Sequence, residues 1–363
     1  MKKCSILIIV LAAMLIVFVS SACAQASPAG VELVHEIRGE RLDLIHHGHI
    51  VIVDENSNVI FYVGDPEAVV FYRSIAKPIQ ALPTLRHNLD IQYGLTDEEI
   101  VIFSASHSGE PFHIAALESI TSKAGLTEDM FIMNPTAPGN RQADIDRIAA
   151  GFPTRRFFHT CSGKHSSLLL LQRHLGGVVT DYWKPGSLAD LEVIEAMKIA
   201  SETDNFEFGV DGCGVPVFAA PLKNIAITFK NFIRPHKMRC EDLAKAAERY
   251  MPLIHRYPHM IGGNWPLGII CTFLNSDPNI VAKSGANAAY AFALKEEGLG
   301  VAIKVTDGAD RVLPLIVMEI LRGLGKLSPE TEARLMQLRP NVIINDNDLV
   351  VGRRVAVFDI PSR

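Results

Sequence analysis

The order of hydrophobic patterns along the chain limits its possible folds more than any other feature. Two strands joined at the polar turn DENSN are predicted by the run HIVIVDENSNVIFYVG, and strand-like runs return near the end of the chain. Between them, over roughly 150–250, apolar residues recur at helical spacing, as in SSLLLLQRHLGG and LADLEVIEAMKIASETD. Strands at both ends with helices between them predict an α/β (α+β) fold, with a mixed or antiparallel sheet, flanking helices and an inserted helical lobe.

Two further stretches add detail to this arrangement. A strand, a loop of serine, histidine and glycine, and then a helix are predicted by EEIVIFSASHSGEPFHIAALESITSKAGL. Strand, helix, strand and helix are predicted in turn by NIVAKSGANAAYAFALKEEGLGVAIKVTDGADRVLPLIVMEILRGLG. No linker rich in proline, glycine or serine separates these segments. We therefore expect two lobes that share one core, in a single domain over residues 30–363.

The composition excludes several classes of protein. The chain has 363 residues, of which 48% are hydrophobic, so it can bury a substantial core and is neither disordered nor fibrous. Its formal net charge is −5, and acidic and basic residues are mixed along the chain. Because no basic stripe is available for a phosphate backbone, we do not expect nucleic-acid binding.

The N-terminus has the pattern of a secretory leader. Lysines at positions 2 and 3 precede the apolar run CSILIIVLAAMLIVFVSSACA, and the small residues Ala22 and Ala24 are spaced for cleavage after ACA. A signal peptide over residues 1–24 and export to the periplasm or the extracellular space are therefore predicted. The alternatives are an uncleaved N-terminal membrane anchor and lipid attachment at Cys23. No later run is long and apolar enough to span a bilayer.

A serine and a lysine stand three residues apart where an apolar helix is predicted to begin, in FYRSIAKPIQALPTL. A proline in the first turn of a helix loses no hydrogen bond, so Pro78 marks the helix start and Ser74 and Lys77 face the same side. A hydroxyl is a weak nucleophile unless a base accepts its proton, and a lysine that is desolvated or close to another cation can serve as that base. Such Ser-x-x-Lys pairs carry out acyl transfer in serine β-lactamases and penicillin-binding proteins.

Two other segments carry residue types that this chemistry needs. The loop SASHSGE contains Ser104, Ser106 and His107, and VAKSG places Lys283 at the end of a predicted strand. The second segment is similar to the Lys-Thr/Ser-Gly element of the same enzymes. The alternatives are an ordinary serine-rich turn that caps the next helix and a solvated lysine. The order Ser-x-x-Lys, serine loop, strand lysine favours a functional site.

Several blocks in one order resemble a known family. RSIAKPIQALP, SASHSGEPFH, TCSGKHSSLL, VDGCGVPVFAAPL, YPHMIGG, VAKSGA and VTDGADRVLP are similar to successive signature blocks of the thermolabile L-asparaginases of the Rhizobium etli type, the asparaginase II family. The resemblance runs from about residue 33 to the C-terminus. It implies a fold like that of serine β-lactamases and glutaminases, the hydrolysis of L-asparagine to aspartate and ammonia, and a homodimer.

The resemblance also implies roles for four residues. Ser74 is the nucleophile and Lys77 its base, Ser106 is a second catalytic hydroxyl that relays a proton, and Lys283 completes the site by acting on Ser106 or on developing charge. Two lysines close together lower each other's pKa, which would satisfy the need for an uncharged base.

A zinc site beside the active site is implied as well. Its ligands would be Cys161 and Lys164 of CSGK and Cys213 of DGCG. Without the resemblance, this spacing is unusual for zinc, and a lysine must lose its proton to coordinate the metal. Four cysteines lie beyond the leader, so a Cys161–Cys213 disulfide or free thiols are the alternatives.

Three residues next to these motifs are candidates for substrate binding. Arg73 and Asp211 could hold the α-carboxylate and the α-ammonium group of an amino acid, and His165 is a candidate supporting group. The chain departs from the family pattern GAEG, because Asn287 and Ala288 occupy the acidic and the glycine positions. The alternatives to an asparaginase are a hydrolase of another amide such as glutamine or of a lactam, and a non-catalytic amino-acid-binding protein.

Overall fold

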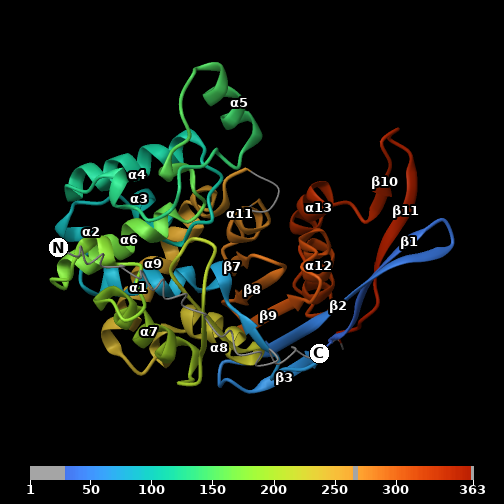
Figure 1. The fold of residues 1–363 in the computed structure, drawn as a ribbon. Coiled ribbons are helices and arrows are strands. Elements are labelled where there is room, and N and C mark those ends of the chain that lie inside the picture. Colours follow the sequence, from blue (N-terminus) through green and yellow to red (C-terminus); the bar gives the residue numbers. More distant parts are fainter. Residues whose placement is uncertain (1–28, 265–268, 361–363) are drawn as a thin grey trace, which may run out of the picture.

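A computed structural model describes residues 29–264 and 269–360 (Figure 1). The leader predicted over residues 1–24 lies outside the described residues. Within the described ranges, no helix is both long enough and apolar enough to cross a membrane.

The larger sheet is antiparallel and has eight strands, in the order β10-β11-β1-β2-β9-β8-β7, with β3 paired to β2 outside this path. The strands are β1 (Val31–Arg38), β2 (Arg41–Val53), β3 (Val59–Val63), β7 (Ile280–Gly285), β8 (Ala289–Leu294), β9 (Leu299–Val305), β10 (Val342–Ile344) and β11 (Val350–Ala356). Strands from the two ends of the chain are therefore neighbours, β1 beside β11 and β2 beside β9. This confirms the predicted antiparallel sheet and the predicted β2–β3 hairpin.

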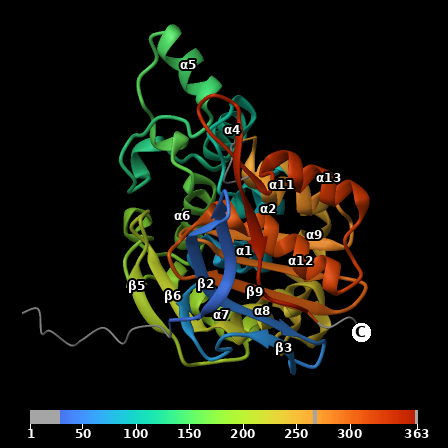
Figure 2. The same ribbon diagram turned by 90° about the vertical axis from the view of Figure 1, so that its right-hand side faces the viewer.

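Most of the helices lie between β3 and β7 in the sequence. They are α1 (Lys77–Arg86), α2 (Leu89–Gln92), α3 (Asp97–Val101), α4 (Pro111–Ala124), α5 (Arg141–Ala149), α6 (Ser162–His174), α7 (Leu188–Ser201), α8 (Leu222–Ile233), α9 (Glu241–Arg256), α10 (His259–Gly262) and α11 (Ile269–Asn275). Between β9 and β10 lie α12 (Leu313–Gly323) and α13 (Pro329–Leu338). Helices thus extend on both sides of the 150–250 segment expected for the lobe, and α5 projects away from the sheet in both views (Figure 2).

A second sheet interrupts the segment that was expected to be helical. Its three antiparallel strands lie in the order β4-β6-β5 and are β4 (Val69–Phe71), β5 (Glu207–Val210) and β6 (Pro216–Pro221). Tyr72 extends this pairing, because its backbone N–H donates to Phe218 O at 2.9 Å. The small sheet therefore places the residues that follow β4 beside the turn between β5 and β6.

The prediction of a strand at EEIVIF is wrong. The chain forms α3 and then a 3₁₀ turn over Ile102–Ser104. Thr96 accepts a hydrogen bond from Glu99 N through its side chain, and the Glu99 carboxylate accepts one from Thr96 N, so a capping box starts a helix here. A short buried apolar run does not distinguish strand from helix by its pattern, and the cap decides.

The prediction of a helix at NAAYAFAL is also wrong, because this segment is β8. All six side chains of β8 are buried, so the alternation that marks a half-exposed strand is missing. Strands β7 and β9 pair with its two edges, and α8 packs along it. Pairing with distant strands outweighs the helical propensity of its alanines.

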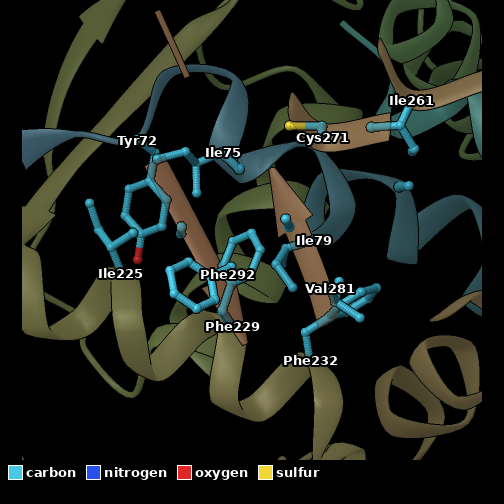
Figure 3. Close-up of a cluster of buried hydrophobic side chains, with 14 of the residues drawn as sticks. Tyr72, Ile75, Ile79, Ile225, Phe229, Phe232, Ile261, Cys271, Val281 and Phe292 are labelled. Carbon is cyan, nitrogen blue, oxygen red and sulfur yellow. The ribbon is translucent and has the colours of Figure 1, made fainter. Parts of the chain in front are cut away.

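An apolar cluster joins the start of α1 to the sheet. Ile79 of α1, Phe229 of α8 and Phe292 of β8 point into one buried cluster, with Tyr72 and Val281 beside them (Figure 3). Burying each such side chain contributes about 1.5–3 kcal/mol. The cluster thereby holds the first turn of α1 close to β7.

Close backbone contact between α8 and β9 requires a glycine. A Cβ atom built on Gly300 would lie 2.1 Å from the carbonyl oxygen of Ala226, so no side chain fits at this position. The helix therefore lies directly on the central strands and buries them.

Candidate active site

The predicted helix start is confirmed, with Ser74 in the turn before it. A 3₁₀ turn covers Arg73–Ala76, α1 begins at Lys77, and Pro78 stands in its first turn. Arg73 has a φ of +49°, a left-handed conformation that is strained for a residue other than glycine. Such strain is typical of residues beside functional groups, and here it directly precedes Ser74.

Two lysines meet at one serine hydroxyl. Lys77 Nζ lies 3.0 Å from Ser106 Oγ and donates to Ala105 O at 2.6 Å. Lys283 Nζ, on β7, lies 2.9 Å from the same Ser106 Oγ and donates to Ser284 O at 2.9 Å. Each lysine is only 1% exposed. The predicted residues Lys77, Ser106 and Lys283 are therefore brought together from three distant segments.

Burial makes Lys283 a weak base. Loss of hydration, together with the nearby positive charge of Lys77, lowers the pKa of Lys283 to about 7. A large fraction of Lys283 is then uncharged at neutral pH. An uncharged amine beside a hydroxyl can accept its proton.

A cavity of about 170 Å³ opens beside these groups. It is lined by Ser74, Ser106, Thr160, Ile270, Ser284, Gly285, Ala286, Asp310, Arg311, Leu313, Pro314, Leu338 and Arg339. Both candidate serines thus reach the same space. Ser74 Oγ makes no hydrogen bond to any described residue, so the predicted contact with Lys77 as its base is not present, and Lys77 Nζ bonds Ser106 and Ala105 instead. The Ser74 hydroxyl is available to a ligand.

Hydrogen bonds from neighbouring elements hold the loop that carries Ser106. Ser106 N donates to Ile261 O at 2.8 Å, and the ring of His107 accepts from Gly109 N at Nδ1 and lies 2.7 Å from Ser162 Oγ at Nε2. Burial lowers the pKa of His107 well below its usual value, so the ring is neutral and donates from Nε2. His107 therefore supports the loop and does not line the cavity.

Gly163 brings α6 against this loop. A Cβ atom on Gly163 would lie 2.0 Å from the carbonyl oxygen of Ile102, so the two backbones touch only because this residue has no side chain. The contact places Thr160 beside the loop that carries Ser106, because Thr160 O accepts from His107 N at 3.2 Å and lies 3.4 Å from Lys77 Nζ.

The predicted metal ligands also lie together. One donor atom each of Cys161, Asp211 and Cys213 lies within 4.8 Å of the others, and Lys164 Nζ lies 3.1 Å from Cys213 Sγ. The four cysteines among the described residues are free thiols. The hydrogen bond from Cys213 lowers the pKa of Cys161 well below its usual value, which favours a thiolate there. Two sulfur donors, an amine and a carboxylate in this space fit a tetrahedral zinc ion.

The three predicted substrate-binding residues do not line the cavity. Arg73 Nε donates to Asp211 Oδ1 at 2.8 Å, so these two residues pair with each other. His165 is fully buried and its Nδ1 lies 2.7 Å from the hydroxyl of Tyr182. None of the three is among the residues that line the cavity.

Most of the cavity-lining residues were not predicted as site residues, and Thr160, Asp310, Arg311 and Arg339 are among them. Thr160 precedes Cys161, and its Oγ1 is buried without a partner among the described residues. Asp310 and Arg311 belong to VTDGADRVLP, a block that was noted only for its resemblance, and Arg339 follows α13. The adjacent opposite charges of Asp310 and Arg311 were a usable signal, whereas nothing in the sequence near Arg339 indicated a site.

A cavity in which serine hydroxyls face buried lysines is typical of enzymes that break acyl bonds. A family model, L-asparaginase II, matches residues 34–356. The chain therefore belongs to the L-asparaginase II family, which confirms the predicted resemblance and supports an amidohydrolase.

Similar solved structures include β-lactamases and glutaminases. A β-lactamase from Mycobacterium bovis has 14% sequence identity and a TM-score of 0.39, with 76% of this chain and 94% of that chain covered. A Bacillus glutaminase has 13% identity and a TM-score of 0.30, with 72% of this chain and 85% of that chain covered. A search of curated proteins gave no significant match. Family membership thus rests on the family model alone.

Proposed function

We propose that this protein is an exported amidohydrolase that cleaves L-asparagine to L-aspartate and ammonia through an acyl-enzyme. Membership of the L-asparaginase II family supports the reaction. The observation that carries the mechanism is the convergence of Lys77 and Lys283 on Ser106 Oγ, at a cavity that Ser74 also lines.

In the first step, Ser74 Oγ attacks the side-chain amide carbon of asparagine. The proton of Ser74 passes to the lysine–serine group of Lys77, Ser106 and Lys283, in which the uncharged amine of Lys283 is the final acceptor. The same group then returns a proton to the amide nitrogen, the C–N bond breaks, and ammonia leaves. The product of this step is an ester between Ser74 and the aspartyl group.

In the second step, water attacks the ester carbonyl. The lysine–serine group accepts a proton from the water and delivers it to Ser74 Oγ as the C–O bond breaks. Aspartate leaves and the enzyme returns to its starting state. Proton transfer by positioned groups contributes about 10²- to 10⁴-fold to such rates.

A zinc ion is proposed beside this site, held by Cys161, Cys213 and Lys164, with the Asp211 carboxylate as a further donor. When bound, zinc supplies a cross-link between the start of α6 and the turn between β5 and β6. Thr160 and Lys77 lie next to that link, so it would help to keep the cavity wall in place.

The first test is ammonia release from asparagine by the purified protein. We expect turnover by the wild type, a loss of about 10³-fold or more in kcat for Ser74→Ala, and no loss for Ser122→Ala, which changes an exposed serine on α4. Mass spectrometry of quenched reactions should locate the aspartyl ester on Ser74. An ester on Ser106 would overturn the assigned nucleophile, and equal rates for Ser74→Ala and wild type would overturn the acyl-enzyme.

A substrate panel distinguishes the alternative functions. Glutamine, simple amides and a penicillin-type lactam should react at least 100-fold more slowly than asparagine if the cavity is built for its polar groups. Faster turnover of glutamine or a lactam would reassign the substrate. Binding of asparagine by calorimetry without any product would favour the non-catalytic binding protein.

A further inference from the structure

The cavity wall carries charges that the proposed chemistry does not use. Asp310 and Arg311 begin the 3₁₀ turn Asp310–Val312, and both line the cavity that Ser74 and Ser106 reach. They are neighbours in the sequence and carry opposite charges. A free amino acid likewise carries an ammonium group and a carboxylate on one α-carbon.

Arg311 is held in position by a buried carboxylate. Its Nε donates to Glu36 Oε1 at 2.8 Å, and Glu36 is only 5% exposed. The same oxygen accepts from Arg354 Nε at 3.1 Å. Arg311 Nη2 reaches His46 Nε2 at 3.4 Å, whereas its Nη1 has no partner among the described residues. The guanidinium is therefore oriented by contacts on one side and keeps donors for a ligand carboxylate, which a planar fork binds well.

Asp310 keeps one carboxylate oxygen available to a ligand. Its Oδ1 accepts from Ala288 N at 2.9 Å, and its Oδ2 has no hydrogen bond within the described part of the chain. Burial raises the pKa of Asp310, because part of the hydration of its carboxylate is lost. A cationic ammonium group from a ligand would compensate for that loss.

We infer that Arg311 binds the α-carboxylate and Asp310 the α-ammonium group of the substrate, so that the site selects free amino-acid amides over peptide-linked or uncharged amides. This inference rests on the proposed function for its substrate. If Arg311 and Asp310 bind the charged groups of the substrate, Arg73 and Asp211 are not needed for that role, and these two residues pair with each other.

The test uses two asparagine analogues that each lack one charged group. Succinamate lacks the α-ammonium group, and 3-aminopropanamide lacks the α-carboxylate. For Arg311→Gln, the ratio of kcat/KM for asparagine to kcat/KM for 3-aminopropanamide should fall about 100-fold relative to wild type. For Asp310→Asn, the ratio of asparagine to succinamate should fall by about the same factor, because an amide does not attract an ammonium group as a carboxylate does.

Two matched controls accompany these variants. Arg354→Gln also removes one arginine from Glu36 but does not change a residue that lines the cavity, so both ratios should stay as in wild type. If Arg311→Gln fails to fold, Arg311→Lys is the second variant, because it keeps the positive charge. It should lower the ratio of asparagine to 3-aminopropanamide by a smaller factor, because lysine lacks the planar guanidinium that binds a carboxylate through two hydrogen bonds. Ratios that do not change in Arg311→Gln or Arg311→Lys would overturn the inference, as would a 100-fold change in Arg339→Gln in place of Arg311→Gln.

Binding measurements separate this inference from the proposed reaction. Calorimetry with L-aspartate, succinate and β-alanine needs no turnover. The wild type should bind L-aspartate at least 10-fold more tightly than succinate or β-alanine, and Arg311→Gln should lose that preference over β-alanine. If asparagine is not hydrolysed but this preference is found, the proposed function fails and the inference stands. Equal binding of all three ligands would overturn the inference whatever the protein hydrolyses.

Discussion

At the scale of single residues, the central feature is the Ser106 hydroxyl, which lies within hydrogen-bond distance of two lysines from distant parts of the sequence. Lys77 lies one turn from Ser74, as its spacing predicted, and Lys283 reaches Ser106 from β7. Positive charges placed close together lower the pKa of at least one of them, and burial acts in the same direction. In the proposed mechanism, an uncharged lysine therefore serves as the base, without a histidine or a carboxylate.

The lowered pKa of Lys283 predicts a pH dependence. Lys283 must be uncharged to accept a proton, and its pKa is about 7, so kcat/KM for asparagine should rise tenfold per pH unit below about pH 7 and level off above it. A pH–rate profile measures this directly. Lys283→Arg should lose most of the activity at every pH, because arginine does not release its proton at accessible pH. A wild-type profile that is flat across about pH 5 to 8 would exclude Lys283 as the base.

At the scale of elements, the turn between β7 and β8 holds the departure from the family pattern. Asn287 has a φ of +60° and Ala288 a φ of +51°, so both adopt the left-handed conformation. Asparagine tolerates it, whereas alanine does so at a cost of about 1–2 kcal/mol. The left-handed φ at position 288 thus explains why the family pattern has a glycine there. In this chain the turn keeps that conformation although the residue is alanine.

Ala288→Gly should therefore stabilise the protein. Removing the left-handed strain stabilises the folded state by more than the greater freedom of glycine stabilises the unfolded chain. We therefore expect the free energy of unfolding to rise by about 0.5–1 kcal/mol. Urea denaturation provides the measurement. The matched control is Ala289→Gly, one residue on in β8, where φ is not positive, and it should destabilise by about 0.5–1 kcal/mol. A destabilised Ala288→Gly would contradict this account of the turn.

The contact between α6 and the β5–β6 turn predicts a response to zinc. A ligand that binds only the folded state at 100 times its Kd stabilises it by about 2.7 kcal/mol, so zinc should raise Tm and a chelator should lower it. Cys213→Ser should abolish the response, whereas Cys240→Ser, outside the cluster, should retain it.

Thiol titration tests the alternative at the same cysteines. With zinc bound and no disulfide, the unfolded protein should show the same number of thiols with and without reductant. Two additional thiols after reduction, together with no metal, would identify a Cys161–Cys213 disulfide instead.

At the scale of the whole molecule, apolar side chains are exposed on the two projecting parts. Ile148 and Phe152 are more than 60% exposed on and after α5, and Leu42 and Val350 are half exposed or more on the β1–β2 and β10–β11 hairpins, which extend away from the rest of the molecule (Figure 1). Exposed apolar surface of this kind marks places where proteins associate. We expect a homodimer, and light scattering measures it. A mass of one chain at every concentration tested would contradict this prediction.

The local sequence alone determined the start of α1, the Ser74–Lys77 spacing and the order of strand-rich and helix-rich segments, because proline, turn residues and hydrophobic period act over a few residues. It did not distinguish helix from strand at EEIVIF or NAAYAFAL, since the apolar parts of both runs, residues 100–103 and 288–294, are buried on all sides and show no alternation of apolar and polar residues. The small sheet β4-β6-β5 was also not predicted, because β4 pairs with β6, a strand far away in the sequence.

Only the tertiary structure decided which residues share the cavity. Lys283 lies 177 residues after Ser106, and the antiparallel pairing of β7 with β8 and of β8 with β9 holds Lys283 in the sheet beside the loop that carries Ser106. The same pairing places Asp310 and Arg311 at the wall that Ser74 faces, which no local pattern specified. Residue types and their short spacings belong to the sequence, whereas the meeting of groups far apart depends on the burial of the whole sheet between its helices.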